Sequence, residues 1–162
     1  IRPSQLLQAL AKAGLTPPGL WDQARTTSLS VPQTPKHRVL LAEDNPDNQF
    51  VVKRMLTTLG CDVDVETSGA NAVKRWREGT YSLILMDCHM PDMDGFEATR
   101  TIRELETEQS RVPIVALTAS VGGEDRSRSL AAGMDDFLGK PVTTERLGEL
   151  LTRWVGSLDA PK

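Results

Sequence analysis

The chain has 162 residues and a formal net charge of −3, with 39% hydrophobic and 25% charged residues. This length allows one domain with a full core plus a short appendage. The slightly acidic balance gives no support for a nucleic-acid surface, which needs a basic face, and no apolar stretch approaches the ~20 residues of a membrane helix. Two cysteines, Cys61 and Cys88, are too few for a disulfide framework or a metal cluster, so we interpret them as reduced, packed thiols in a cytoplasmic protein.

The N-terminal part of the chain differs from the rest. Residues 26–37 are rich in Thr, Ser, Pro and Gln and are expected to form a linker. Residues 1–25 are expected to form a helical extension. This expectation rests on three leucines at helical spacing: Leu6, Leu7 and Leu10. Residues 1–12 also resemble residues 142–153, which leads to the hypothesis that residues 1–25 end a preceding domain of the same type; chance similarity of two amphipathic helices is the alternative.

From residue 38 onward, short apolar runs alternate with helical patterns. The predicted strands are residues 39–42, 61–66, 82–86, 112–117 and 134–138. The predicted helices are residues 46–59, 68–78, 96–106, 123–132 and 143–156. Such alternation predicts an α/β domain over residues 38–156, with a doubly wound, five-stranded parallel sheet and helices on both faces. Residues 157–162 are expected to form a short tail.

Local signals support the helix boundaries. Asn45 is expected to cap the helix over residues 46–59, with Pro46 at its first position and Gly60 at its end. Ser68 is expected to cap the next helix. The first of these helices is predicted to have one apolar face, made of Phe50, Val51, Met55, Leu56 and Leu59.

Reactive side chains follow four of the predicted strands. Glu43 and Asp44 close one apolar run, and Asp87 closes another. Because ligands gather at the carboxyl ends of parallel strands, we expect one acidic pocket that is large enough for a divalent cation. Two further strand ends add the hydroxyl of Thr118 and the ammonium of Lys140 to the same edge. Carboxylates, a hydroxyl and a lysine together indicate phosphoryl chemistry.

Four motifs carry a resemblance to a known family. They are LLAEDNPDN (residues 40–48), ILMDCHMPDMDG (84–95), VALTA (115–119) and DDFLGKPV (135–142). Each motif ends a predicted strand, and their order resembles the receiver domain of two-component signalling, the response-regulator phosphoacceptor module. The resemblance covers residues 38 to about 156. It implies a flavodoxin-like sheet with strand order 2-1-3-4-5.

The resemblance also implies roles for the acidic pocket. Asp87 would be the nucleophile that accepts a phosphoryl group from a phosphohistidine on a partner. Crowded carboxylates repel one another, so a hard cation such as Mg2+ is expected, held by Glu43, Asp44 and Asp87 with the backbone carbonyl of His89. Lys140 would pair with Asp87 in the empty site and with a phosphoryl oxygen in the phosphorylated one. Such a domain promotes its own phosphorylation and dephosphorylation.

A conformational switch is implied as well. The Thr118 hydroxyl would move toward the phosphoryl group and leave a space behind it, which Phe137 would enter. The alternative is that Phe137 is an ordinary core residue. The family further implies a cis peptide bond at Pro141, which would aim Lys140 inward.

Other polar residues of the motifs receive simpler interpretations. Asp92 and Asp94 are interpreted as turn or cap residues, and Asp47 as a first-turn carboxylate that favours the helix dipole. His37 and His89 are interpreted as bystanders to the phosphorylation chemistry. His89 is nevertheless predicted to tune the lifetime of the phosphoryl group, because it borders the path of the hydrolytic water.

The motifs look most like receivers attached to hybrid sensor histidine kinases. The leading hypothesis is therefore a receiver that exchanges phosphoryl groups with a histidine kinase domain and a histidine phosphotransfer protein, on the cytoplasmic side, within a parent histidine kinase that could be membrane-anchored. No direct contact with nucleic acid is expected. The alternatives are a free single-domain response regulator that docks on a target, and a Mg2+-dependent hydrolase with an aspartyl-phosphate intermediate. That hydrolase class usually has an aspartate two residues after the nucleophile, where this chain has His89.

Overall fold

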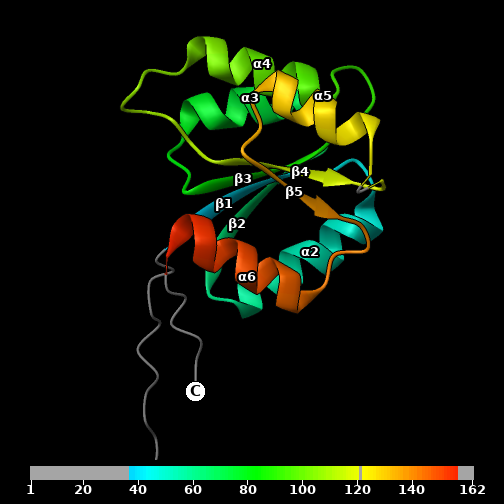
Figure 1. Cartoon of the computed structure of the whole chain (residues 1–162). Helices are drawn as coiled ribbons and strands as arrows, with labels where there is room; N and C mark the ends of the chain where they lie inside the picture. Colours follow the sequence, from blue (N-terminus) through cyan, green and yellow to red (C-terminus); the bar gives the residue numbers. More distant parts are fainter. Residues whose placement is uncertain (1–36, 121, 157–162) are drawn as a thin grey trace, which may run out of the picture. The chain divides into compact units, whose positions relative to one another are not determined.

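The computed structural model describes residues 37–120 and 122–156, which form a five-stranded parallel sheet flanked by helices (Figure 1). The strand order is β2-β1-β3-β4-β5, as predicted. The strands are β1 (His37–Ala42), β2 (Cys61–Glu66), β3 (Leu83–Asp87), β4 (Ile114–Thr118) and β5 (Asp136–Gly139). The helices are α2 (Pro46–Thr58), α3 (Gly69–Glu78), α4 (Gly95–Leu105), α5 (Glu124–Ala132) and α6 (Thr144–Val155). The helix expected within residues 1–25 lies outside the described residues.

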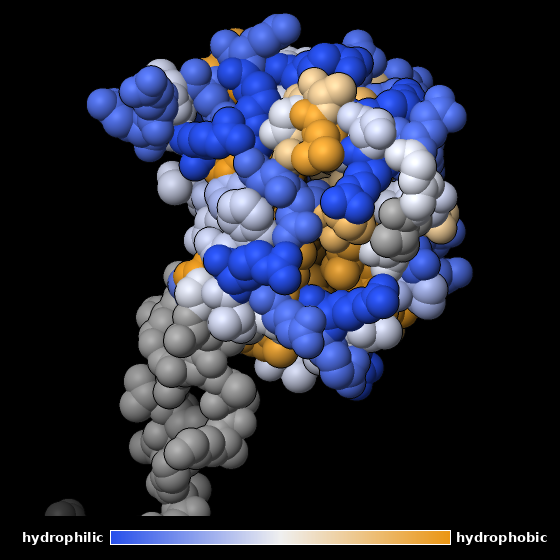
Figure 2. All heavy atoms as spheres, in the orientation of Figure 1, coloured by the Kyte–Doolittle hydropathy of each residue, from blue (hydrophilic) through white to orange (hydrophobic). Residues whose placement is uncertain are grey.

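Two hydrophobic clusters hold the helices on the sheet, one on each face. Figure 1 shows α3, α4 and α5 over one face and α2 and α6 over the other. Successive strand residues point to opposite faces, so that Ile84 belongs to the first cluster and Leu85 to the second. Every residue of β3 and β4 is buried, as expected for the central strands of a parallel sheet. The face shown in Figure 2 is largely polar, with small apolar patches.

Three helices begin at residues that were predicted as caps or as turn or cap residues. The Asn45 side chain accepts hydrogen bonds from two backbone N–H groups of the first turn of α2, and the Ser68 hydroxyl accepts one from the N–H of Asn71 at the start of α3. Asp94 accepts from the N–H of Glu97 at the start of α4, which confirms its interpretation as a cap. Gly133 ends α5 with φ 97°, a left-handed conformation that favours glycine.

One prediction for α2 is wrong. Phe50 and Val51, which we expected on its apolar inner face, are 66% and 45% exposed. Leu56 is buried as predicted, and Met55 and Leu59 pack beside it, but the residue that joins them is Val52, one helical turn before Leu56. Val52 and Leu56 lie on one side of the helix, and Phe50 and Val51 lie on another. Only one of these two pairs can face the sheet. The first pair faces it, and the second is left on the surface.

Asp136, the first residue of β5, links this edge strand to α6. Its carboxylate accepts hydrogen bonds from Trp154 Nε1 (3.0 Å), Arg153 Nη1 (2.8 Å) and the Phe137 backbone N–H (2.9 Å). Burial by itself raises the pKa of Asp136, but these bonds outweigh it and hold the pKa below its usual value. The edge strand is thereby fixed to the last helix.

The two cysteines lie on opposite faces of the sheet. Cys61 belongs to the cluster under α2 and α6, and Cys88 to the cluster under α3, α4 and α5. Both are buried free thiols, and burial raises the pKa of Cys61 and that of Cys88, the latter to about 11. Within residues 37–120 and 122–156, no helix has the length and apolar character needed to cross a bilayer.

Candidate functional site

The sheet brings the predicted site residues to one edge. Ala42 pairs with Met86, so Glu43 follows β1 at the level where Asp87 ends β3. Thr118 is the last residue of β4, and Lys140 follows the last residue of β5. In a parallel sheet these carboxyl ends share one edge, which is where ligands bind in such folds. The strand-end prediction is therefore confirmed for the backbone.

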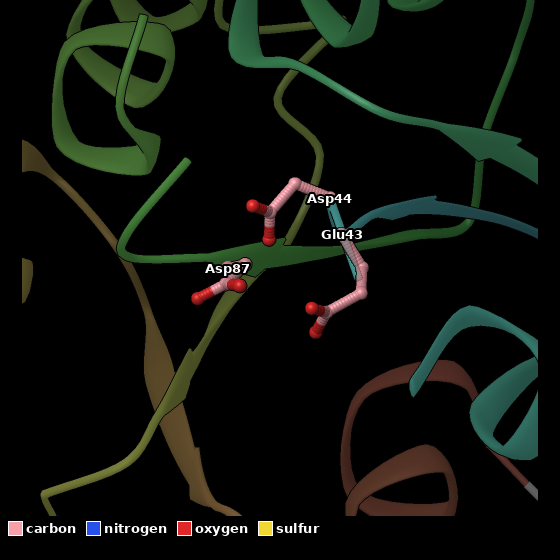
Figure 3. Close-up of side chains that lie close together, drawn as sticks. All are labelled: Glu43, Asp44 and Asp87. Atoms are coloured by element: carbon pink, nitrogen blue, oxygen red, sulfur yellow. The ribbon is translucent and has the colours of Figure 1, made fainter. Parts of the chain in front are cut away.

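Three carboxylates converge at this edge. Glu43, Asp44 and Asp87 each offer an oxygen, and these oxygens lie within 4.8 Å of one another (Figure 3). Glu43 is 1% exposed and Asp87 is 4% exposed, whereas Asp44 lies on the surface. Charges of one sign at this distance repel strongly when they are partly shielded from water. The cluster therefore requires positive charge.

Lys140 supplies part of that charge. Its Nζ lies 2.9 Å from Asp87 Oδ2 and 2.8 Å from Glu43 Oε2, which confirms the predicted pairing with Asp87. Burial by itself lowers the pKa of Lys140, but its contacts with Glu43 and Asp87 raise it above the usual value. The Lys140–Pro141 peptide bond is cis, as the family resemblance implied. One ammonium faces three carboxylates, so negative charge remains in excess.

Glu43 provides the test of whether a metal fits. Its Oε1 accepts hydrogen bonds from the backbone N–H of Asn45 (3.3 Å) and from Asn48 Nδ2 (3.2 Å). Its Oε2 is buried, and it faces the ammonium of Lys140 at 2.8 Å in an ion pair that Lys140 shares with Asp87. A buried carboxylate oxygen whose ammonium contact is shared with Asp87, beside two further carboxylates, fits a hard cation such as Mg2+.

Asp87 is held from both sides of its carboxylate. Oδ1 accepts from the backbone N–H of His89 at 3.1 Å, and Oδ2 accepts from Lys140. The loop after β3 folds back so closely that a Cβ on Gly95 would collide with the Asp87 backbone carbonyl. Glycine is therefore required at this position to keep Asp87 in place. Coordination by the His89 carbonyl stays a prediction.

Thr118 has a partner that the sequence did not indicate. Its hydroxyl is shared between the Ser120 backbone carbonyl (2.9 Å) and Asp125 Oδ2 (3.1 Å). His89 Nε2 lies 3.3 Å from the same oxygen of Asp125. Asp125 lies in the first turn of α5, where an acidic residue is common in any helix, so the sequence carried no signal for this role. Phe137 is half-buried, with the guanidinium of Arg126 4.9 Å from its ring centroid.

Comparisons with known proteins agree with this geometry. Residues 39–152 match the family model described as response regulator receiver domain. Hybrid signal transduction histidine kinase B of Dictyostelium discoideum is 46% identical over 117 residues, which cover 66% of this chain and 6% of that protein. The chain thus spans a small part of the length of this relative.

Solved structures show the same fold. The receiver domain of sensor histidine kinase PA1611 from Pseudomonas aeruginosa PAO1, with a magnesium ion coordinated in its active-site cleft, is 45% identical. It covers 75% of this chain and 98% of its own, with a TM-score of 0.69. The receiver domain of Ssk1 from Saccharomyces cerevisiae, co-crystallised with the histidine phosphotransfer protein Ypd1, is 35% identical with a TM-score of 0.70, over 79% and 94% of the two chains. The chain belongs to the response regulator receiver domain family.

Proposed function

We propose that Asp87 is the phosphoacceptor of a two-component phosphorelay. The observation that carries this proposal is the buried Asp87 carboxylate, which lies between Lys140 and two further carboxylates at the end of the central strand. A carboxylate oxygen of Asp87 attacks phosphorus in the phosphohistidine of a partner. The new O–P bond forms as the N–P bond breaks, and the imidazole nitrogen leaves with the bonding electron pair.

Glu43, Asp44 and Asp87 hold Mg2+ in this proposal, with the His89 backbone carbonyl as a further oxygen ligand. When bound, the ion neutralises the charge on the carboxylates and on the incoming phosphoryl oxygens. Asn45 and Asn48 keep Glu43 oriented toward the cluster through their hydrogen bonds to Oε1.

Lys140 and Thr118 bind the transferred group. The ammonium of Lys140 exchanges Asp87 Oδ2 for a phosphoryl oxygen, because phosphorylation converts this carboxylate into a mixed anhydride and moves the negative charge to the phosphoryl group. Thr118 lies at the end of the neighbouring strand and donates its hydroxyl to another phosphoryl oxygen. Phe137 lies on the next strand, half-buried, and responds to the movement of Thr118.

The exposed part of α2 is the proposed docking surface for a histidine phosphotransfer protein. Phe50 and Val51 are exposed large apolar side chains on the helix that follows Glu43 and Asp44. They border a hollow of about 230 Å³, lined by Phe50, Val51, Arg54, Met55, Thr58 and Thr144. The related receiver domain of Ssk1 is co-crystallised with such a partner. A helix of the partner with an apolar face fits a hollow of this kind.

The parent protein is proposed to be a hybrid sensor histidine kinase that acts in the cytoplasm. Support comes from the hybrid kinase named above and from the receiver of the sensor kinase PA1611. In this arrangement the kinase histidine and the phosphotransfer histidine exchange phosphoryl groups with the same aspartate.

Incubation with acetyl phosphate and Mg2+, followed by intact-mass measurement, tests the phosphoacceptor. The wild-type chain is expected to gain the mass of one phosphoryl group, and Asp87→Ala to gain none. Asp47→Asn is the matched control, because Asp47 is an exposed carboxylate in the first turn of α2, outside the acidic cluster. Equal mass gain in wild type and Asp87→Ala would assign the phosphoryl group to another residue.

The docking surface needs a separate measurement. Phe50→Ala is expected to slow phosphoryl transfer from a phosphorylated histidine phosphotransfer protein about fivefold or more, since buried aromatic anchors dominate interfaces. Phosphorylation by acetyl phosphate should be unaffected. Leu130→Ala, which removes an exposed leucine on the opposite side of the sheet, is the control. Equal transfer rates in all three chains would argue against this surface.

A further inference from the structure

Asp125 is a largely buried carboxylate that the proposed phosphotransfer does not use. Its side chain is 16% exposed. One oxygen, Oδ2, faces both the Thr118 hydroxyl at 3.1 Å and His89 Nε2 at 3.3 Å. Thr118 ends β4 and His89 follows β3, so this oxygen joins α5 to the ends of two central strands. Asp125 is separate from the described carboxylate cluster, which consists of Glu43, Asp44 and Asp87.

The position of Asp125 is fixed by its own backbone. Its carbonyl accepts a hydrogen bond of 2.7 Å from the hydroxyl of Ser129, which is 3% exposed. The Ser129 oxygen in turn lies 3.9 Å from Cys88 Sγ, directly after Asp87. The first turn of α5 is thereby anchored to the end of β3. The Asp125 carboxylate is held where it can engage Thr118 and His89 together.

Asp125 competes with a phosphoryl group for the Thr118 hydroxyl. A hydroxyl has one proton to donate, and here it is directed to Ser120 and Asp125. To donate to a phosphoryl oxygen on Asp87, it must leave these acceptors. A carboxylate is the stronger acceptor of the two, because hydrogen bonds to ionised groups are roughly twice as strong as neutral ones.

We infer that Asp125 is a positioning residue of the proposed phosphoacceptor site, which holds Thr118 and His89 in the unphosphorylated arrangement and so opposes phosphorylation. The inference rests on the proposed function of Asp87. The same contact sets a threshold for the switch, because each phosphoryl group must displace Asp125 before Thr118 can respond. Asp125 acts through Thr118 and does not touch the reacting atoms.

The test uses beryllofluoride with Mg2+ as a phosphoryl mimic on the intact chain, with affinity measured by titration. Asp125→Ala is expected to bind the mimic about five- to tenfold more tightly than wild type, the effect of losing one competing charge-assisted hydrogen bond. Asp125→Asn keeps the shape of the side chain without the charge and should lie between the two. Glu124→Ala is the matched control, since Glu124 is an exposed acidic residue of the same helical turn and should leave affinity unchanged.

A double-mutant cycle separates positioning from a general structural effect. In a Thr118→Val background, Asp125→Ala should no longer tighten binding, because the competing donor is gone. Unchanged or weaker binding in both Asp125 variants, or the same tightening in the Thr118→Val background, would overturn the inference. Failure of the wild-type chain to bind the mimic would instead overturn the proposed function of Asp87, and this inference with it.

Discussion

Asp44→Asn should make the chain more stable than wild type without metal and less stable than wild type in Mg2+. Asp44 places an oxygen within 4.8 Å of oxygens of Glu43 and Asp87. At that separation one pair of charges repels by about 1 kcal/mol in water and by about 3.5 kcal/mol at an effective dielectric constant of 20. Asp44 is exposed, so the lower figure applies to each pair, and lost attraction to Lys140 offsets part of the gain. The metal-free variant is expected to be about 1 kcal/mol more stable than wild type.

In Mg2+ the wild-type chain should become the more stable of the two. The wild-type chain is stabilised by about 2.7 kcal/mol at a Mg2+ concentration one hundred times the Kd. The variant lacks one ligand and should lose most of that gain. Urea unfolding in chelator and in Mg2+ measures both effects, with Asp47→Asn as the control carboxylate outside the cluster. Lower stability of Asp44→Asn in chelator, or equal stabilisation of both chains by Mg2+, would refute the electrostatic reasoning.

Three further changes test the supports of the site. Gly95→Ala should lower the free energy of unfolding by about 1–3 kcal/mol and reduce the mass gained from acetyl phosphate, because the alanine Cβ would collide with the Asp87 carbonyl. Unchanged stability and unchanged phosphorylation would contradict the close approach. Asn45→Ala removes the cap of α2, next to Glu43, and should lower stability by about 1 kcal/mol in urea unfolding. The pKa of Asp136 is held below its usual 3.8, so this carboxylate adds stability above that pH and loses it as the pH falls through the folded-state pKa. Asp136→Asn should therefore destabilise the chain at neutral pH, with a difference that shrinks below about pH 4; a difference independent of pH would rule out this linkage.

The sequence predicted the scaffold of the site because its signals are local. Apolar runs that end in carboxylates mark central parallel strands, and a parallel sheet has one carboxyl edge where Asp87 and Lys140 must meet. Caps such as Asn45 act within a few residues of themselves. These features depend little on how distant side chains pack.

The remaining features depend on contacts between distant segments. Phe50 and Val52 are both apolar and two residues apart, and the packing of α2 on the sheet decides which one is buried. Asp125 resembles any first-turn acid, and its partner His89 lies 36 residues earlier in the chain. The direction of the Thr118 hydroxyl follows from its own hydrogen bonds to Ser120 and Asp125. Periodicity and motif spacing carry no information on such pairings.

The placement of one cysteine in each hydrophobic cluster makes the two halves of the core separately observable. A thiol with its pKa near 11, shielded from water, reacts slowly with alkylating agents until the layer around it opens. Labelling of Cys61 therefore reports opening between the sheet and the α2–α6 layer, and labelling of Cys88 reports opening beneath α3, α4 and α5. Comparing the two rates with and without a phosphoryl mimic would reveal which layer loosens when the domain is activated.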